Sequence, residues 1–220
     1  MTRDEFAGMI DHTLLKPAAT YGQLETVCLE AVTFGFATVA IQPAVVGFAH
    51  RVLAGSRVGI TTGISYSQGN TSLPMKLKEI DIALADGATD CDVVINLGAL
   101  YEGNYSLLKE EAQECRRATE GHIAKAILEV CLLSEQQIRV ACEIFADSGF
   151  DYVKSSTGYR VAPTFEQIKL MADSVAGSGT KVKAAGGIST VEQAIAFIEV
   201  GVSRIGTSRG TTLIGEFLAC

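Results

Sequence analysis

One pattern repeats along this chain and limits what it can fold into: a short apolar run, a polar or glycine turn, and then an amphipathic stretch. The apolar runs are Met9–Leu15, Ala37–Ile41, Val58–Ile64, Cys91–Ile95, Ala124–Val130, Tyr152–Lys154, Val182–Ala185 and Ser203–Gly206. The stretches of helical periodicity between them are Gln23–Thr33, Met75–Ala85, Leu107–Thr119, Glu135–Ala146, Phe165–Val175 and Val191–Val200. Strands that are apolar on both faces and alternate with helices imply a parallel sheet covered by helices.

Eight strand candidates in 220 residues favour a compact (β/α)₈ barrel of the TIM type, a fold that typically takes about 250 residues. The alternative is an open doubly wound sheet, but the G-x-G-x-x-G fingerprint that usually follows its first strand is absent. No low-complexity run or linker interrupts the sequence. We therefore expect residues 1–220 to form a single barrel domain.

Local signals set several helix ends. Ser134 and Thr190 stand directly before periodic stretches, where a side-chain oxygen can cap the first turn. Gly87, Gly149 and Gly201 follow three of these stretches, and glycine tolerates the left-handed backbone that ends many helices. Each of these glycines returns the chain to the next strand within two or three residues.

Composition excludes several classes of function. Lys+Arg of 18 against Asp+Glu of 25 gives a net charge of -7, which argues against a general nucleic-acid binder but not against a small anionic substrate. No apolar stretch approaches the roughly 20 residues of a membrane span, and the N-terminus lacks a signal-peptide core. Six cysteines without a C-x-x-C pair indicate reduced thiols and a cytoplasmic protein. A homo-oligomer stays open, because the helix faces are too evenly amphipathic to single out an interface.

The carboxyl ends of the strands should carry the chemistry, as they do in such barrels. Lys154 and Lys183 are unusual there because they lie inside apolar runs on neighbouring strands. A pair of buried lysines can be structural and paired with carboxylates, or it can supply a nucleophile. Lowering a lysine pKa to about 7 disfavours its ammonium by roughly 4–5 kcal/mol. A second ammonium about 4 Å away contributes about 4 kcal/mol at an effective dielectric of about 20, and burial can add the rest. The pair therefore points to a Schiff-base nucleophile.

Strand alternation predicts where the nearby carboxylates point. Asp92 should point away from the side that Cys91 and Val93 share. If that side is the interior, Asp92 can orient a lysine or relay a proton. Asp90 shares this alternation but lies nearer the turn, so we expect it to be solvated.

Two glycine-containing loops after the seventh and eighth strands predict a phosphate site. Such loops, with a helix N-terminus, commonly bind phosphate in these barrels. The candidate residues there are Gly186, Gly187, Gly206, Thr207, Ser208 and Arg209. Arg209 could equally be a solvated residue at the helix start.

The sequence indicates no metal site, because His12, His50 and His122 have no ligand spacing. His12 closes the first strand and suggests a polar role at the barrel mouth, whereas His50 and His122 should lie on the surface or in loops. Other interpretations are a phosphate-sensing barrel without catalysis and a phosphate isomerase. The two strand lysines disfavour both.

Together these segments resemble the deoxyribose-phosphate aldolase family, in family order and over most of the chain. The matching segments are Ile10–Pro17, Asp92–Asn96, Glu129–Leu133, Tyr152–Gly158, Val182–Ile188 and Ser203–Ser208. The resemblance implies a class I aldolase without metal or other cofactor. Its small-molecule reactants would be a sugar phosphate, 2-deoxy-D-ribose 5-phosphate, and the products acetaldehyde and D-glyceraldehyde 3-phosphate. Such an enzyme would serve the catabolism of deoxyribonucleotides and carbohydrates.

The resemblance also implies residue roles. Lys154 would form the Schiff base, Lys183 would lower its pKa, Asp92 would join a proton relay, and Asp11 would orient Lys183. Gly186, Gly187, Gly206 and Ser208 would match the phosphate-binding loops of the family. We also expect Thr157, Gly158, Thr207 and, outside the family pattern, Arg209 to bind the substrate or its phosphate.

The chain departs from the family pattern at two further places. The third strand usually ends in G-F-P-x-G, but here it reads Gly63-Ile64-Ser65-Tyr66-Ser67-Gln68-Gly69, which leaves the aldehyde preference open. Ala40 stands where the family usually has a cysteine. We therefore hypothesise that this chain resists inactivation by reactive aldehydes. Another class I aldolase, acting on a different sugar phosphate or an unphosphorylated aldehyde, is a related alternative.

Overall fold

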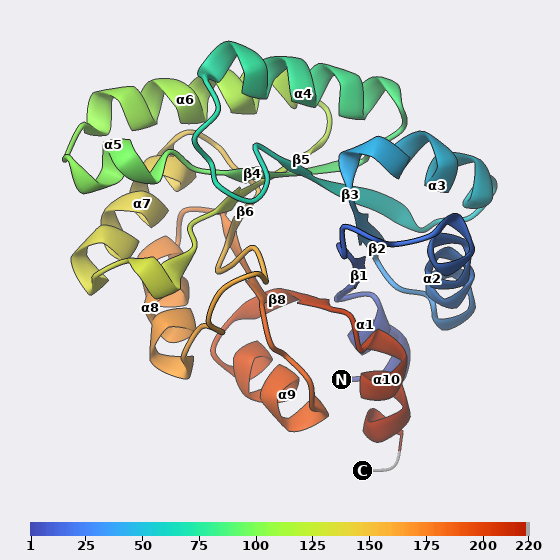
Figure 1. The fold of residues 1–220 in the computed structure, drawn as a ribbon. Coiled ribbons are helices and arrows are strands. Elements are labelled where there is room, and N and C mark those ends of the chain that lie inside the picture. Colours follow the sequence, from blue (N-terminus) through green and yellow to red (C-terminus); the bar gives the residue numbers. More distant parts are fainter. Residues whose placement is uncertain (219–220) are drawn as a thin grey trace.

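The eight apolar runs form a closed parallel barrel in the computed structural model, which describes residues 1–218 (Figure 1). Each strand pairs with the next along the chain, and the first pairs with the last. The predicted (β/α)₈ fold is confirmed. The strands are β1 (Ile10–Leu14), β2 (Thr38–Ile41), β3 (Gly59–Ile64), β4 (Asp90–Val94), β5 (Ile123–Ile127), β6 (Tyr152–Lys154), β7 (Lys181–Ala185) and β8 (Val202–Thr207).

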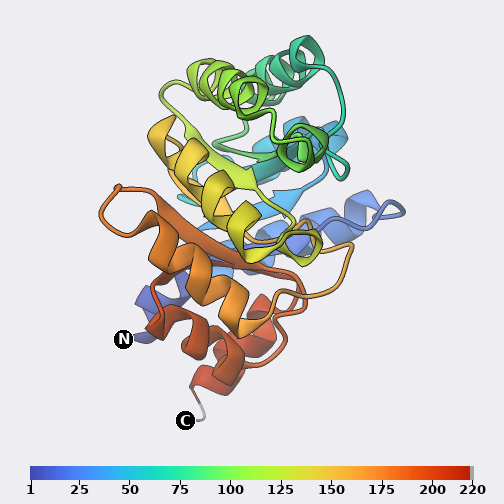
Figure 2. The same cartoon turned by 90° about the vertical axis from the view of Figure 1, so that its left-hand side faces the viewer.

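Helices surround the barrel and bury its outer face, as Figures 1 and 2 show from two sides. They are α1 (Arg3–Ala7), α2 (Tyr21–Phe34), α3 (Val46–Val52), α4 (Leu73–Ala85), α5 (Leu97–Tyr101), α6 (Tyr105–Ala118), α7 (Glu135–Asp147), α8 (Phe165–Val175), α9 (Val191–Glu199) and α10 (Gly210–Phe217). Two short 3₁₀ turns, η1 (Pro43–Val45) and η2 (Val130–Leu132), follow β2 and β5. Among residues 1–218, no helix combines the length and apolar character that crossing a membrane requires.

The predicted helix ends are confirmed. Ser134 caps α7 through the amide of Gln137, and the Gln137 side chain accepts from the Ser134 amide in return. Gly87, Gly149 and Gly201 have φ angles of 105°, 81° and 104°, each one residue beyond a helix cap. Only glycine adopts this conformation without strain, so these residues fix where each helix turns back to the barrel.

Three short helices and one strand end differ from the sequence prediction. The helices α1, α3 and α5 were not predicted, because segments of five to seven residues carry too little periodicity. The fifth strand was expected to reach Val130 but ends at Ile127. Glu129 has a φ angle of 54°, and η2 follows directly, so the chain leaves the strand direction there.

A buried ion pair outside the barrel fixes the carboxyl end of β4. Lys76 on α4 and Glu111 on α6 are almost inaccessible, and Nζ lies 2.8 Å from Oε2. The same ammonium donates to the carbonyl of Val94 at 2.8 Å, while Glu111 accepts from the amide of Asn96 at 2.9 Å. Two helices therefore hold the backbone directly after Asp92, and nothing in the sequence pattern predicted this pair.

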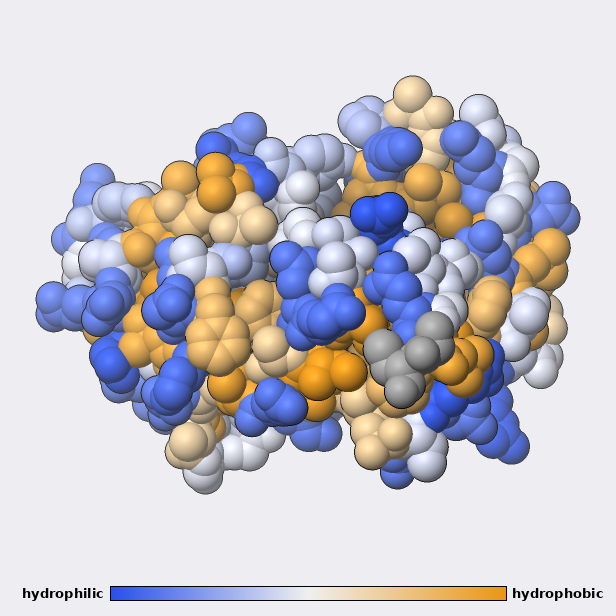
Figure 3. All heavy atoms as spheres, turned by 90° about the horizontal axis from the view of Figure 1, so that it is seen from below, coloured by the Kyte–Doolittle hydropathy of each residue, from blue (hydrophilic) through white to orange (hydrophobic). Residues whose placement is uncertain are grey.

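The first and last helices pack together beside the barrel (Figure 1). The rings of Phe6 and Phe217 stack with centroids 4.9 Å apart. On the face of the molecule shown in Figure 3, apolar residues form small patches among charged and polar ones. This view shows no extended surface of a single character.

Candidate active site

The inward-facing side chains of β4, β6 and β7 meet at one carboxylate. The ammonium nitrogens of Lys154 and Lys183 lie 2.7 and 2.9 Å from the same Oδ2 atom of Asp92. Lys154 and Lys183 are register partners on neighbouring strands, so their side chains leave the sheet at one level. All three residues are buried. Asp92 faces the barrel interior, which the alternation of β4 had left open.

Asp11 on β1 completes this group from the other side. Its Oδ2 lies 2.5 Å from Nζ of Lys183, and its Oδ1 accepts from Arg204 on β8 at 2.8 Å. Sequence reasoning missed Arg204. Its position on β8 shares the alternation of Gly206, two residues later, which could have placed it on the inner face.

A third buried lysine, Lys125 on β5, also lies in the barrel. Its Nζ is 2.6 Å from Asp90 and 3.0 Å from Asp92. The expectation that Asp90 is solvated is wrong: its side chain is 3% exposed, because it points inward below Asp92 and pairs with Lys125. The sequence analysis did not single out Lys125, although it lies in an apolar run as Lys154 and Lys183 do.

The cluster contains three carboxylates and four basic groups, and among these Arg204 alone is only partly buried. The carboxylates are Asp11, Asp90 and Asp92, and the bases are Lys125, Lys154, Lys183 and Arg204. With every group ionised the cluster carries one excess positive charge in a region with little water. Loss of a single proton from one lysine neutralises it, which removes an electrostatic cost of burial.

Lys154 is the lysine whose surroundings favour that loss. Burial lowers its pKa most, the charge of Lys183 adds to the effect, and Asp92 opposes it, so that its pKa is lowered to about 8. Burial also acts against the ammonium of Lys125, but Asp92 and Asp90 outweigh it and raise the pKa of Lys125 above its ordinary value. The lysines around Asp92 hold the pKa of that carboxyl well below its usual range, although burial alone would raise it.

The segment after Lys154 is held by Glu129, which is 1% exposed. Its Oε2 accepts from the hydroxyl of Thr157 at 2.5 Å, and its Oε1 accepts from the Thr157 amide at 3.3 Å. Thr157 therefore uses its own polar groups to position the loop, and Gly158 follows with a φ angle of 93°. The left-handed backbone of Glu129 turns its side chain into this contact.

An open pocket of about 590 Å³ reaches from the lysines to the loops after β7 and β8. It brings together most of the residues predicted from sequence. Those that line it are Lys154, Thr157, Gly158, Lys183, Gly186, Gly187, Gly206, Thr207, Ser208 and Arg209. Asp11 and Asp92 lie beneath it, in contact with the lysines. Gly186 and Gly187 have φ angles of 97° and 71°, which suit glycine and leave the pocket wall free of side chains.

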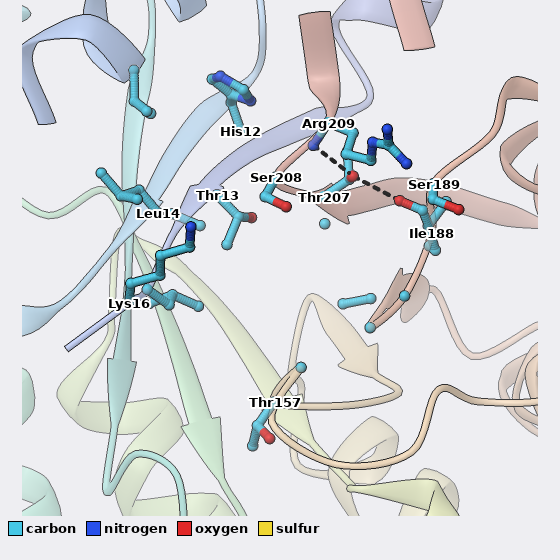
Figure 4. Close-up of a pocket in the computed structure, with 18 of the residues that line it drawn as sticks. His12, Thr13, Leu14, Lys16, Thr157, Ile188, Ser189, Thr207, Ser208 and Arg209 are labelled. Carbon is cyan, nitrogen blue, oxygen red and sulfur yellow. Dashed lines mark hydrogen bonds between the residues drawn. The ribbon is translucent and has the colours of Figure 1, made fainter. Parts of the chain in front are cut away.

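The polar residues at the far end of the pocket have different tasks (Figure 4). The hydroxyl of Thr207 donates to the carbonyl of Ile188 at 2.8 Å and accepts from the amide of Arg209 at 3.0 Å. Thr207 therefore links the two loops, and its hydroxyl proton is taken up by the carbonyl of Ile188. Within residues 1–218, no hydrogen bond or ion pair holds the side chains of Ser208 or Arg209. Lys16, which sequence reasoning did not assign, lines the opposite side of the pocket in this view.

The remaining candidate ligands and thiols lie elsewhere. His12 is the exception, because it lines the pocket (Figure 4) on the side of α2, where its Nε2 is 2.7 Å from Glu30. His50 on α3 and His122 are exposed, as expected. In the part of the chain that the structure describes, no group of three or more His, Cys, Asp and Glu side chains is placed to hold a metal ion. Ala40 lines the pocket, and no cysteine among residues 1–218 does.

These features define a class of protein: a (β/α)₈ barrel with a buried lysine of lowered pKa below an open pocket, as an aldolase that works through a Schiff base requires. Comparison with known proteins gives the family. Residues 6–211 match the family model described as DeoC/LacD family aldolase, and the chain belongs to that family.

Curated relatives cover nearly the whole chain. Deoxyribose-phosphate aldolase 1 of Mesoplasma florum is 42% identical over 206 residues, which cover 93% of each chain. The deoxyribose-phosphate aldolase of Caldicellulosiruptor saccharolyticus is 41% identical over 220 residues, covering 98% of this chain and 100% of the relative.

Solved structures agree with the fold. The aldolase named QR15 superposes with a TM-score of 0.92 at 35% identity, covering 97% of this chain and 96% of that one. The tetrameric deoxyribose phosphate aldolase of Aeropyrum pernix has a TM-score of 0.87 at 28% identity, covering 99% and 93%.

The charge cluster predicts how stability responds to loss of Asp92. Asp92→Asn leaves three lysines with one carboxylate fewer, and we expect the free energy of unfolding at pH 7 to fall by about 3–5 kcal/mol. Loss of Asp92 removes the charge that opposes the lowering of the Lys154 pKa, so this pKa lies further below the unfolded value of about 10.4 and the unfolded state binds more protons. Stability should therefore rise from pH 7 towards pH 10.

Chemical denaturation at pH 7 and at pH 9.5 measures this effect. Asp81→Asn, which removes an exposed carboxylate on α4, is the matched control and should change little. A loss in Asp92→Asn that is equal at both pH values would contradict the electrostatic explanation.

Proposed function

We propose that this chain is a class I aldolase that reversibly cleaves 2-deoxy-D-ribose 5-phosphate into acetaldehyde and D-glyceraldehyde 3-phosphate. The observation that carries the proposal is the amine of Lys154, buried at the floor of an open pocket with its pKa lowered to about 8. The curated relatives named deoxyribose-phosphate aldolase support the choice of substrate. The other aldolase substrates considered above have no such support.

The proposed reaction begins with neutral Lys154. Its nitrogen attacks carbon 1 of the open-chain sugar, and loss of water gives an iminium ion. The hydroxyl on carbon 3 then loses its proton while the bond between carbons 2 and 3 breaks. The bonding electrons move into the iminium, which becomes an enamine as glyceraldehyde 3-phosphate leaves. Protonation of carbon 2 and addition of water release acetaldehyde and regenerate the amine.

Neighbouring residues have supporting roles in this proposal. Lys183 lowers the pKa of Lys154 by charge repulsion, and Asp11 fixes Lys183 at 2.5 Å. Asp92 takes part in proton relay, because its Oδ2 holds both Lys154 and Lys183 while its Oδ1 lies 3.0 Å from the ammonium of Lys125.

The other end of the pocket suits the phosphate. The loop after β7 leaves backbone accessible at Gly186 and Gly187, Gly206 lines the pocket from within β8, and α10 begins directly after Arg209, where helix amides attract an anion. Ser208 and Arg209 have unpaired polar groups among the described residues, so both can turn to a phosphate. Thr207 contributes by holding the two loops together.

The proposal extends to location and assembly. We place the protein in the cytoplasm, since Cys28, Cys91, Cys115, Cys131 and Cys142 are all free thiols. A homo-oligomer is supported by the relative from Aeropyrum pernix, which is tetrameric.

Reductive trapping tests the Schiff base. Borohydride reduction in the presence of acetaldehyde should add one ethyl group to Lys154, found by mass spectrometry of peptides. Lys154→Met should abolish the adduct, whereas Lys169→Met, which removes an exposed lysine on α8, should keep it. No adduct, or one on a different lysine, would overturn the proposed mechanism.

Kinetics with a phosphorylated and an unphosphorylated sugar test whether Arg209 binds the phosphate. Arg209→Ala should raise KM for 2-deoxyribose 5-phosphate roughly tenfold or more, the usual effect of losing a hydrogen bond to a charged group. It should leave turnover of unphosphorylated 2-deoxyribose nearly unchanged. Arg160→Ala removes an exposed arginine that does not line the pocket and serves as the control. Equal effects on both sugars would remove Arg209 from the phosphate site.

A further inference from the structure

The turn after β3, where this chain departs from the family pattern, places a tyrosine ring inside the barrel mouth. Gly63 faces inward at the level of Asp92, its register partner on β4. A Cβ atom on Gly63 would lie 2.6 Å from Cδ2 and 2.7 Å from Cγ of Tyr66. The ring of Tyr66 therefore fills the space that a side chain at position 63 would take, beside the carboxylate that holds Lys154.

Hydrogen bonds on both sides hold this ring in place. Ser65 has a φ angle of 52°, and its amide donates to Glu79 at 2.5 Å while its hydroxyl accepts from Thr71 at 2.7 Å. Across the mouth, the Tyr66 hydroxyl donates to the carbonyl of Thr157, three residues after Lys154. Burial, followed by the charge of Asp92, raises the pKa of Tyr66, so its hydroxyl keeps the proton that it donates.

A second tyrosine, Tyr159, lies beside Tyr66, and the two rings form one wall of the site. The rings of Tyr66 and Tyr159 are tilted by 59° with centroids 5.7 Å apart. The Tyr159 hydroxyl donates to the carbonyl of Leu15, and Gln42 donates both to that carbonyl at 2.8 Å and to the Tyr159 oxygen at 3.3 Å. The ends of β1, β2, β3 and β6 are thus joined through two rings.

The wall closes one side of the site and leaves the other open. The pocket reaches Lys154 and Tyr159 and extends to the loops after β7 and β8, but it stops short of Tyr66. A phosphate chain attached at Lys154 can extend along the pocket towards these loops. We expect a larger group on the aldehyde carbons to meet the opposite side, where the Tyr66 ring fills the space over Gly63.

We propose that Tyr66, supported by Tyr159, is a specificity-determining residue that restricts the aldehyde donor on Lys154 to two carbons. The inference rests on the proposed function and adds to it the residue that sets donor size. This role requires a rigid wall, because a site that can rearrange would also accept a donor that is longer by one methylene. The hydrogen bond of the preceding Ser65 amide to Glu79 and the packing of the Tyr66 ring over Gly63 supply that rigidity.

Donor competition tests the inference. We compare kcat/KM for propanal and acetaldehyde as donors, with D-glyceraldehyde 3-phosphate as acceptor, and measure the borohydride-trapped adduct of each donor on Lys154. Tyr66→Ala should raise the propanal-to-acetaldehyde ratio about tenfold or more, the usual discrimination of one methylene. Tyr66→Leu, which keeps an apolar group over Gly63, should give a smaller rise and serves if the alanine variant fails to fold.

Two further variants distinguish the effect of the Tyr66 ring from that of its hydroxyl and from that of an unrelated tyrosine. Tyr66→Phe keeps the ring and should hold the donor ratio within about threefold of the wild-type value, below the effect of one methylene. Tyr101→Ala removes a tyrosine on α5 whose hydroxyl also donates to a backbone carbonyl, that of Leu132, and it should leave the ratio unchanged.

The possible failures are distinguishable. A wild-type protein that forms no acetaldehyde adduct on Lys154 would overturn the proposed function and this inference with it. If the wild-type protein forms the adduct but the donor ratio is unchanged in both Tyr66→Ala and Tyr66→Leu, this inference alone is overturned. A ratio in Tyr66→Phe that rises as much as in Tyr66→Ala would also contradict the wall, because the ring is still present.

Discussion

The excess of one positive charge in the buried cluster is the constraint on which the site depends. Three carboxylates face four basic groups. The unbalanced positive charge costs free energy, because the barrel interior holds little water to solvate it. The lysine that loses a proton is Lys154, which shares Asp92 with Lys183 and has no carboxylate of its own. Lys183 has Asp11 and Lys125 has Asp90. Unequal pairing, rather than burial alone, selects the nucleophile.

The rest of the fold keeps these charges at fixed distances. The Lys76–Glu111 pair holds the end of β4, Glu129 holds the segment after Lys154, and Tyr66 connects that segment to β3. Because each contact joins different elements, the side chains around Lys154 cannot move apart to relieve their repulsion. The open side of the pocket, by contrast, is formed by glycine-containing loops that leave backbone accessible.

Much of this could be predicted from the sequence, for identifiable reasons. The barrel followed from eight apolar runs, and the neighbouring positions of Lys154 and Lys183 followed from their place on consecutive strands. What was missed depends on contacts between distant segments: Lys125 meets Asp90, Arg204 meets Asp11, and Tyr66 meets Thr157. Asp90 was misjudged because closeness to a turn suggested solvent, whereas strand alternation already placed it on the same side of β4 as Asp92.

The pKa of Lys154, with and without the charge of Lys183, tests the central claim most directly. The rate of Schiff-base formation with acetaldehyde, measured by rapid trapping at Lys154 from pH 6 to pH 10, reports the fraction of neutral amine. The wild-type protein should show an apparent pKa of about 8. Lys183→Met removes the repulsion and should raise the apparent pKa of Lys154 by a unit or more. Two like charges about 4 Å apart repel each other by about 4 kcal/mol at an effective dielectric of about 20, which is more than one pKa unit. An apparent pKa that stays the same or falls in Lys183→Met would contradict the account.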